Sequence, residues 1–313
     1  MLTSLFNIII FPGILFLFVF GFTAEFLDRK ICARLQNRIG PPWFQPVADF
    51  LKLLGKQDII PQDADKKAFK LMPVVALTAV ITAYLYIPIW SGKALFSFNG
   101  DIVVILYLLT IPTLTYFLGG WYSRSVYSMV GAVRSLTQLF AYEVPLFLTI
   151  LSSALLANSW SLSEVASFYG QHPGYCAFNI LGFLVALVSL LGKLEKVPFD
   201  IPEAETEVVA GTFTEYGGKY LALFRIAMDI ELVVGASLLS AVFLQFGLKL
   251  PVRSYFFVYL LQVVFIIGSV SLLRSLFARL RLDQMVDLCW KWFAPLAFLQ
   301  LLINLIIKGF FLK

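Results

Sequence analysis

Long stretches without a single charged residue decide what this chain can fold into. Residues 1–24, 71–92, 102–123, 144–163, 165–192 and 254–273 contain no Asp, Glu, Lys or Arg. A helix that crosses a bilayer needs about 20 mostly apolar residues. Charged residues make up 14% of the chain, whereas soluble domains have about 25%. The sequence therefore predicts an all-α integral membrane protein, because helices satisfy their own backbone groups in lipid.

The apolar stretches predict about eight transmembrane helices within one membrane domain that covers residues 1–313. We place these spans near residues 3–26, 69–90, 102–120, 131–157, 177–192, 219–246, 254–274 and 288–308. The connections between them are too short for a further soluble domain.

The distribution of basic residues predicts the orientation of these spans. Most of the 24 Lys and Arg residues fall in or beside the first, third, fifth and seventh loops. Cytoplasmic loops of membrane proteins carry the excess of Lys and Arg. We therefore expect these loops to be cytoplasmic, both termini to lie outside, and the chain to sit in the cell membrane.

Residues 44–55 of the first loop predict a cytoplasmic amphipathic helix. One face is apolar, with Phe44, Val47, Phe50, Leu51 and Leu54, and the other carries Asp49, Lys52 and Lys56. Such a helix fits the headgroup level of a membrane. It fits equally well beneath a partner subunit, and the sequence leaves both interpretations open.

Several charged residues fall inside or at the ends of the predicted spans, where an unpaired charge is costly and indicates function. The fourth span carries Arg134 and Glu143, and the first ends with Glu25, Asp28 and Arg29. The sixth carries Arg225, Asp229 and Glu231. Arg225 and Asp229 are four residues apart and can pair on a helix. The alternative for each charge is an ion pair inside the bundle or a side chain that reaches the surface.

The densest acidic segment connects the fifth and sixth spans. We call residues 193–218 loop five; its carboxylates are Glu195, Asp200, Glu203, Glu205, Glu207 and Glu215. Repulsion between carboxylates and partial burial both raise the pKa of such groups, and interacting groups titrate together. A proton relay and an acidic docking surface are both consistent with this segment.

The sequence offers few ligands for a redox cofactor. The three cysteines, Cys32, Cys176 and Cys289, have no CxxC spacing, and His172 is the single histidine. An iron–sulfur cluster needs about four thiolates. We therefore expect no cofactor and no metal site in this chain, and nothing indicates nucleic-acid binding.

Four sequence blocks resemble the family of the complex I subunit that bears the quinone pocket, and its hydrogenase relatives. Loop five reads PFDIPEAETEVVAGTFTEYGGKYLALF, and the first loop contains DRKICARLQNRIGPP and FQPVADFLKLLGKQ. GAVRSLTQLFAYEVPL lies at the fourth span and RLRLDQMVDLCWKWFAPLA before the last. The blocks follow the family order over nearly the whole chain, and together they are highly specific.

The resemblance implies a subunit that docks a peripheral redox arm and starts an ion-translocating chain. Its partners would be peripheral redox subunits at the cytoplasmic loops, antiporter-like membrane subunits and membrane lipid. Iron–sulfur clusters, and nickel–iron in the hydrogenase branch, would lie in those partners. The proton-pathway residues that the resemblance and the span charges indicate are Glu143, Asp200, Glu203, Glu205, Glu207, Glu215, Asp229 and Glu231. The matching residues Arg29, Arg34, Arg38, Asp283 and Gln284 are interpreted as structural or docking residues.

Three departures from the complex I pattern distinguish this chain. The first loop is short at GPPWFQPVAD, Lys196 stands in the place of an Arg, and Met228 stands in the place of an acidic residue. The short loop resembles the membrane-bound hydrogenase branch and its sulfur-reducing relatives, which use ferredoxin and no quinone.

Three functions follow as hypotheses. The first is the anchor and proton-coupling subunit of a ferredoxin-linked, ion-translocating hydrogenase or sulfane sulfur reductase complex. The second is the quinone-site subunit of NADH:quinone oxidoreductase, that is, complex I. The third is a stand-alone secondary transporter, which broken helices and inverted repeats would support.

Overall fold

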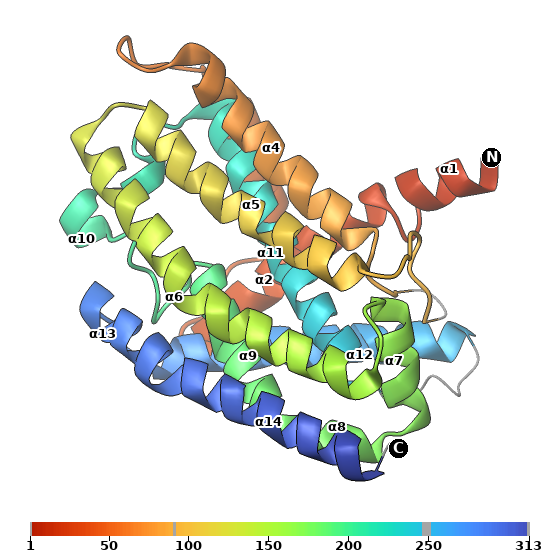
Figure 1. Cartoon of the computed structure of the whole chain (residues 1–313). Helices are drawn as coiled ribbons and strands as arrows, with labels where there is room; N and C mark the ends of the chain where they lie inside the picture. The colour runs from red at the N-terminus through yellow and green to blue at the C-terminus, as the bar shows by residue number, and fades with distance from the viewer. Residues whose placement is uncertain (1, 90–91, 246–251, 312–313) are drawn as a thin grey trace.

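The computed structural model describes residues 2–89, 92–245 and 252–311, and these residues form helices and connecting turns without strands (Figure 1). The first half contains α1 (Leu2–Ile9), α2 (Ile14–Leu35), α3 (Gln45–Leu54), α4 (Lys66–Tyr84), α5 (Asp101–Tyr122) and α6 (Val126–Ala157). The all-α prediction is confirmed.

The second half begins with α7 (Leu162–Gln171), α8 (Gly174–Phe178) and α9 (Ile180–Lys193). Loop five adds α10 (Glu205–Val208) and the 3-10 turn η1 (Gly211–Phe213). The chain continues through α11 (Gly218–Phe243), α12 (Val252–Leu276), α13 (Leu282–Leu288), the π-helical turn η2 (Cys289–Phe293) and α14 (Ala294–Phe311).

Within the described residues, seven helices are long and apolar enough to cross a membrane. They cover Phe6–Leu35, Lys66–Tyr84, Asp101–Tyr122, Val126–Ala157, Gly218–Phe243, Ser254–Leu276 and Leu282–Phe310. The predicted span at 177–192 differs, because α9 has only 14 residues. At about 1.5 Å per residue it is shorter than the roughly 30 Å hydrocarbon core.

Buried amide groups explain why the chain tolerates a break before α9. Asn179 separates α8 from α9, and its side-chain oxygen accepts hydrogen bonds from Asn304 at 2.8 Å and Gln300 at 3.1 Å, both on α14. Non-helical backbone at membrane depth requires partners inside the protein. The α14 amides anchor this junction.

The predicted first span, residues 3–26, is also divided. Pro12 lies between α1 and α2, and proline lacks the N–H that a continuing helix needs. Beyond this break α2 runs to Leu35, further than predicted, so that Glu25, Asp28 and Arg29 all lie on a helix. The N- and C-termini lie at the end of the bundle opposite α10 (Figure 1).

Helix α11 forms the centre of the bundle, packed by α2, α3, α4 and α12. It is buried along nearly its whole length. A helix that is apolar on all sides belongs at the centre of such a bundle. Its few charged residues, Arg225, Asp229 and Glu231, are thereby placed among the other helices.

Loop five is pressed into the bundle against α6. Gly211 adopts φ +53°, and a Cβ there would lie 1.8 Å from the carbonyl oxygen of Pro202. A Cβ on Gly131 of α6 would lie 2.6 Å from the Thr212 nitrogen. Only glycine permits such close approach of two backbones, so these two residues hold loop five inside the protein.

The predicted amphipathic helix is confirmed as α3, which packs on α2 and α11. The ring of Phe50 lies 5.6 Å from that of Phe22 on α2. Val47, Leu51 and Leu54 remain exposed, so the apolar face is available to lipid or to another subunit.

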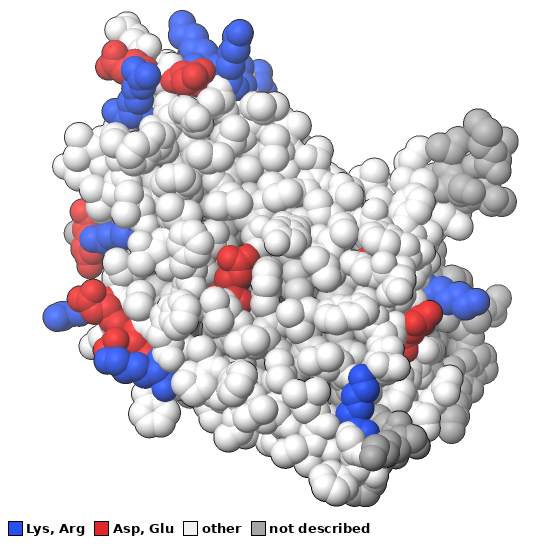
Figure 2. All heavy atoms as spheres, viewed as in Figure 1, with Lys and Arg blue, Asp and Glu red and all other residues white. Residues whose placement is uncertain are grey.

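Charged side chains gather at the ends of the bundle and leave an uncharged band between them (Figure 2). One acidic spot interrupts that band over α5 and α6. The multi-pass membrane architecture accounts for the band, because ionised groups avoid the hydrocarbon core.

The predicted orientation can be tested by cysteine labelling, since the native thiols Cys32, Cys176 and Cys289 are buried. We expect Val209→Cys, at an exposed position of loop five, to react from the cytoplasmic side only. His172→Cys, exposed after α7 at the opposite end, is the matched control and should react only from outside. Labelling of Val209→Cys from the external face would reverse the assigned orientation.

Candidate functional site

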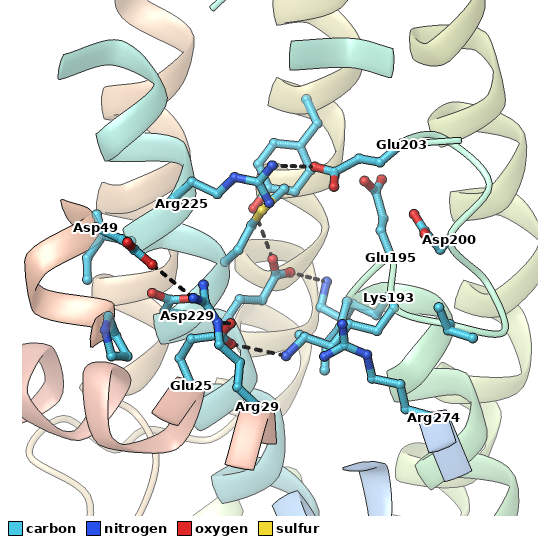
Figure 3. Close-up of a pocket in the computed structure, with 18 of the residues that line it drawn as sticks. Glu25, Arg29, Asp49, Lys193, Glu195, Asp200, Glu203, Arg225, Asp229 and Arg274 are labelled. Carbon is cyan, nitrogen blue, oxygen red and sulfur yellow. Dashed lines mark hydrogen bonds and ion pairs between the residues drawn. The ribbon is translucent and has the colours of Figure 1, made fainter. Parts of the chain in front are cut away.

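A cavity of about 320 Å³ lies between α2, α3, α9, α11 and loop five. More than half of its lining residues are ionisable, and their charged groups point toward one common space (Figure 3). The acidic ones are Glu25, Asp49, Glu195, Asp200, Glu203, Asp229 and Glu231, and the basic ones Arg29, Lys193, Lys196, Arg225 and Arg274. We call this space the charged cavity.

One side of the charged cavity is held by Asp28, whose side chain is fully buried. Its carboxylate accepts from Lys196 of loop five at 2.6 Å and from Arg274 of α12 at 2.8 Å. Burial alone would lower the pKa of Lys196, but the carboxylates of Asp28 and Glu25 raise it above its usual value. Lys196 is therefore a permanent cation that ties loop five to α2.

The α3 side is closed by a second chain of ion pairs. Arg29 of α2 contacts Glu25 at 2.6 Å and Asp49 of α3 at 3.0 Å. Because Glu25 also lies 3.4 Å from Lys196, the two groups of ion pairs are continuous. They join α2, α3, α12 and loop five at one end of the bundle.

On α11, Arg225 pairs with Glu203 of loop five at 3.4 Å. The sequence instead suggested a pair between Arg225 and Asp229. Among the ion pairs that the structure describes, Arg225 joins Glu203, and Asp229 faces the charged cavity near Glu25 and Lys196. Loop five folds back over α11, which brings a distant carboxylate closer than the neighbour on the same helix.

The most deeply buried charges are Lys193, the last residue of α9, and Glu231 of α11. Their side chains are only 2% and 1% exposed, and the ammonium lies 3.0 Å from the carboxylate. Tyr116 of α5 donates a hydrogen bond to Glu231 at 3.2 Å, and Lys193 also donates to the Leu109 carbonyl. Such a pair survives in a low-dielectric interior only with good geometry and additional hydrogen bonds.

Glu195 lies beside this pair, in loop five just after α9. Its buried carboxyl accepts a hydrogen bond from the Ser135 hydroxyl. Burial, with Glu203, Glu231 and Asp200 nearby, raises the pKa of Glu195 to about 8, although the bond from Ser135 opposes the rise. Near neutral pH this carboxyl holds a proton that small electrostatic changes can release.

Glu143 lies halfway along α6, outside the lining of the charged cavity. Its half-buried carboxylate is under the electrostatic influence of Lys193. The adjacent phenol of Tyr142 is 3.0 Å from the Thr113 hydroxyl and interacts with Glu231, Glu195 and Glu143. Since Glu143 is the single acidic residue of α6, it accounts for the acidic spot on the uncharged band (Figure 2).

The structure gathers only part of the predicted pathway. Asp200, Glu203, Asp229 and Glu231 line the charged cavity, whereas Glu215 does not. Glu207 points to the surface and pairs with Arg134 of α6 at 2.5 Å, and this arginine lowers its pKa. The side chain of Glu205 lies outside the described residues. Glu203 and Glu207 are therefore separated, although one helical turn between them suggested a coupled pair.

Sequence reasoning assigned no site to Lys193, Lys196 or Asp49. The two lysines served there to orient the spans, and Asp49 only marked the polar face of the amphipathic helix. A signal was available for Lys193, because a basic residue at the end of an uncharged run directly precedes the densest acidic segment.

Metal ligation has no support in the described ranges, where no three His, Cys, Asp or Glu side chains gather closely enough to hold an ion. What the charged cavity offers is a set of carboxylates in contrasting environments. Some are fixed by Lys or Arg, and Glu195 titrates near neutrality.

Comparisons with known proteins place the chain in a family. Residues 7–305 match the family described as NADH dehydrogenase. An NADH-quinone oxidoreductase membrane subunit from Dehalococcoides mccartyi (strain CBDB1) is 34% identical over 97% of this chain and 86% of the relative. The corresponding protein of Carboxydothermus hydrogenoformans is 31% identical over 94% and 85%.

A solved structure supports the same grouping. A chain of the membrane-bound sulfane sulfur reductase, an archaeal respiratory membrane complex, superposes with a TM-score of 0.84 and 26% identity. The alignment covers 97% of this chain and 98% of that one. The relatedness spans the charged cavity, α6 and both ends of the bundle, and so this chain is a multi-pass membrane protein that belongs to the NADH dehydrogenase family.

Proposed function

We propose that this chain is the membrane-anchor and proton-coupling subunit of a ferredoxin-linked, ion-translocating complex of the membrane-bound hydrogenase or sulfane sulfur reductase type. Its place is the cell membrane, with loop five cytoplasmic and both termini outside. Peripheral iron–sulfur subunits dock at the loop-five end, and antiporter-like subunits lie beside the membrane helices. The likeness to a sulfane sulfur reductase chain over nearly its full length supports this branch.

The observation that carries the proposal is the buried pair of Lys193 and Glu231 between the charged cavity and Glu143. On one side Glu195 titrates near neutrality. On the other side Glu143 opens onto the uncharged flank of the bundle (Figure 2). Ionisable groups at membrane depth mark proton relays, and these groups lead from loop five to a lateral exit.

Electrostatics supplies the coupling. A reduced iron–sulfur cluster in a docked subunit adds negative charge near loop five. Two unit charges about 10 Å apart interact by roughly 1.7 kcal/mol at an effective dielectric near 20, which is about one pKa unit. The added charge raises the pKa of a nearby carboxyl. Glu195 therefore gains a proton on reduction and releases it on reoxidation.

The proton that Glu195 releases has a defined route. Glu231 and the Tyr116 phenol lie next on the path, and Tyr142 and Thr113 follow toward Glu143. Lys193 compensates the charge of whichever carboxylate is ionised, since it acts on both Glu231 and Glu143. A partner membrane subunit beside α6 then accepts the proton.

The names of the sequence relatives favour a second function, the quinone-site subunit of NADH:quinone oxidoreductase. Ligand sites for largely apolar molecules are lined mainly by apolar and aromatic side chains. The charged cavity is lined mostly by ionisable groups, and Met228 faces it where the complex I pattern has an acid. These features favour the ferredoxin-linked branch.

Purification of the complex in mild detergent tests the proposal. We expect iron–sulfur subunits and no flavin subunit to accompany the tagged chain, and quinone-site inhibitors to leave electron transfer from ferredoxin unchanged. A flavin arm together with potent inhibition at a stoichiometric dose would assign the chain to complex I. Recovery of the chain alone with full transport activity would assign it to the stand-alone transporters.

A further inference from the structure

A second cavity, of about 530 Å³, lies between the ends of α2 and α12 on the loop-five side. Residues 36–41, which follow α2, form one wall. Its polar lining includes Arg29, Arg38, Arg274, Gln36 and Ser275, and the apolar ring of Phe277 lies at its edge. We call it the arginine cavity.

The arginine cavity is positively charged. Three guanidinium groups line it, and none of its lining residues is Asp or Glu. Arg29 is paired with Glu25 and Asp49 on the side of the charged cavity, and Arg274 shares Asp28 with Lys196.

Arg38 strengthens this positive charge. Its guanidinium donates to the neutral side chain of Gln36. Lys30 adds another positive charge at the wall, where its ammonium donates to the Pro41 carbonyl at 3.4 Å. Cations outnumber carboxylates in this cluster, and a low-dielectric wall concentrates the resulting field.

The depth of the arginine cavity matches the membrane surface. It lies where two membrane-spanning helices end. Below it, α12 presents an apolar stripe to its surroundings, formed at helical spacing by Phe257, Leu261, Phe265, Leu272 and Leu276. The stripe ends at Leu276, between the cavity residues Ser275 and Phe277. A charged headgroup site therefore continues directly into a surface suited to an acyl chain.

We propose that the arginine cavity binds the phosphate headgroup of an anionic phospholipid, with an acyl chain along the α12 stripe. Guanidinium groups bind phosphate oxygens through charge-assisted hydrogen bonds, often two at a time. Arg38 and the free edges of Arg29 and Arg274 supply these donors. The lipid screens the positive end of the Asp28 ion pairs and covers the exposed apolar stripe. This proposal does not depend on the coupling function.

Lipid retention by the purified, delipidated complex tests the proposal. Dioleoyl phosphatidylglycerol and dioleoyl phosphatidylcholine share their acyl chains and differ in headgroup charge. By native mass spectrometry, we expect the complex to retain the phosphatidylglycerol and to lose the phosphatidylcholine. Arg38→Gln should weaken phosphatidylglycerol binding by about tenfold, the loss expected for one charge-assisted hydrogen bond to phosphate.

Arg34→Gln is the matched control, because Arg34 is an exposed arginine on the same end of α2 that does not line the cavity. It removes the same charge and should leave binding unchanged. Inorganic phosphate at millimolar concentration should not compete, because it lacks the acyl chains.

Three results would overturn the proposal. Equal losses in Arg34→Gln and Arg38→Gln would reduce the effect to general surface charge. Full competition by inorganic phosphate would make the cavity a site for small anions. Binding of phosphatidylglycerol by the isolated chain but not by the assembled complex would assign the cavity to a protein partner.

Discussion

Glu231→Gln alone is expected to destabilise the folded chain by about 3–5 kcal/mol, because it leaves the Lys193 ammonium buried without a counter-charge. Both side chains are almost completely inaccessible, and 3.0 Å separates their charged atoms. Glutamine keeps the shape of the side chain and can still accept the hydrogen bond from Tyr116. The loss would therefore report charge rather than packing, and thermal unfolding in detergent micelles measures it.

The double variant Lys193→Met/Glu231→Leu should recover most of that stability. Replacement of a buried ion pair by apolar groups of similar volume is often neutral, since it also removes the cost of desolvating two charges. The exposed pair of Lys291 and Asp287, 2.7 Å apart, is the matched control. Its removal should cost less than about 1 kcal/mol.

The same double variant separates stability from coupling. A chain that folds but lacks both charges should assemble with its partners and fail to move protons. If Glu231→Gln were as stable as the wild-type chain, Lys193 and Glu231 would not form a charged pair, and the relay would lose its central element.

The helices could largely be predicted from the sequence, because uncharged runs of spanning length leave a membrane protein few alternatives. Boundaries deviated where local chemistry intervened. Pro12 ended the first helix early, and Asn179 shortened α9 through its bonds to α14. The second effect depends on residues more than 100 positions away, which no local pattern contains.

The candidate site was predicted by residue type but not by partner. Glu203 and Glu207 are one turn apart only if a helix contains both, and α10 begins at Glu205. Glu203 therefore faces Arg225 and Glu207 faces Arg134. Periodicity arguments fail at such a helix start.

Ion pairs between distant elements were beyond the reach of sequence reasoning. Asp28 meets Lys196 and Arg274 across 168 and 246 positions. Lys193 was interpreted only as a topology signal, because a lysine at the end of a span ordinarily reaches the membrane surface. The fold instead buries it against Glu231.

Replacing Glu143 with Gln should have the largest effect on coupling. Glu143 is the last titratable group on the proposed route and lies halfway along α6, under the influence of Lys193. Glutamine preserves size and hydrogen bonding but carries no transferable proton. Positioned acid–base groups speed proton transfer by about 10²–10⁴-fold, so translocation should fall close to the background leak. Electron transfer should continue, because the redox centres lie in partner subunits.

Glu207→Gln is the control that the structure provides for this experiment. It removes one carboxylate from loop five, but this carboxylate lies on the surface beside Arg134 and outside the charged cavity. Its loss should leave both electron transfer and translocation close to wild type. A general effect of acidic charge on docking would instead appear in this variant first.

The decisive measurement is the number of ions translocated per electron by the purified complex in proteoliposomes, compared for wild type, Glu143→Gln and Glu207→Gln. The account predicts unchanged electron transfer in all three, with translocation lost only in Glu143→Gln. Full translocation by an assembled Glu143→Gln complex would contradict it, and would reduce the buried charges to ion pairs that hold the bundle together.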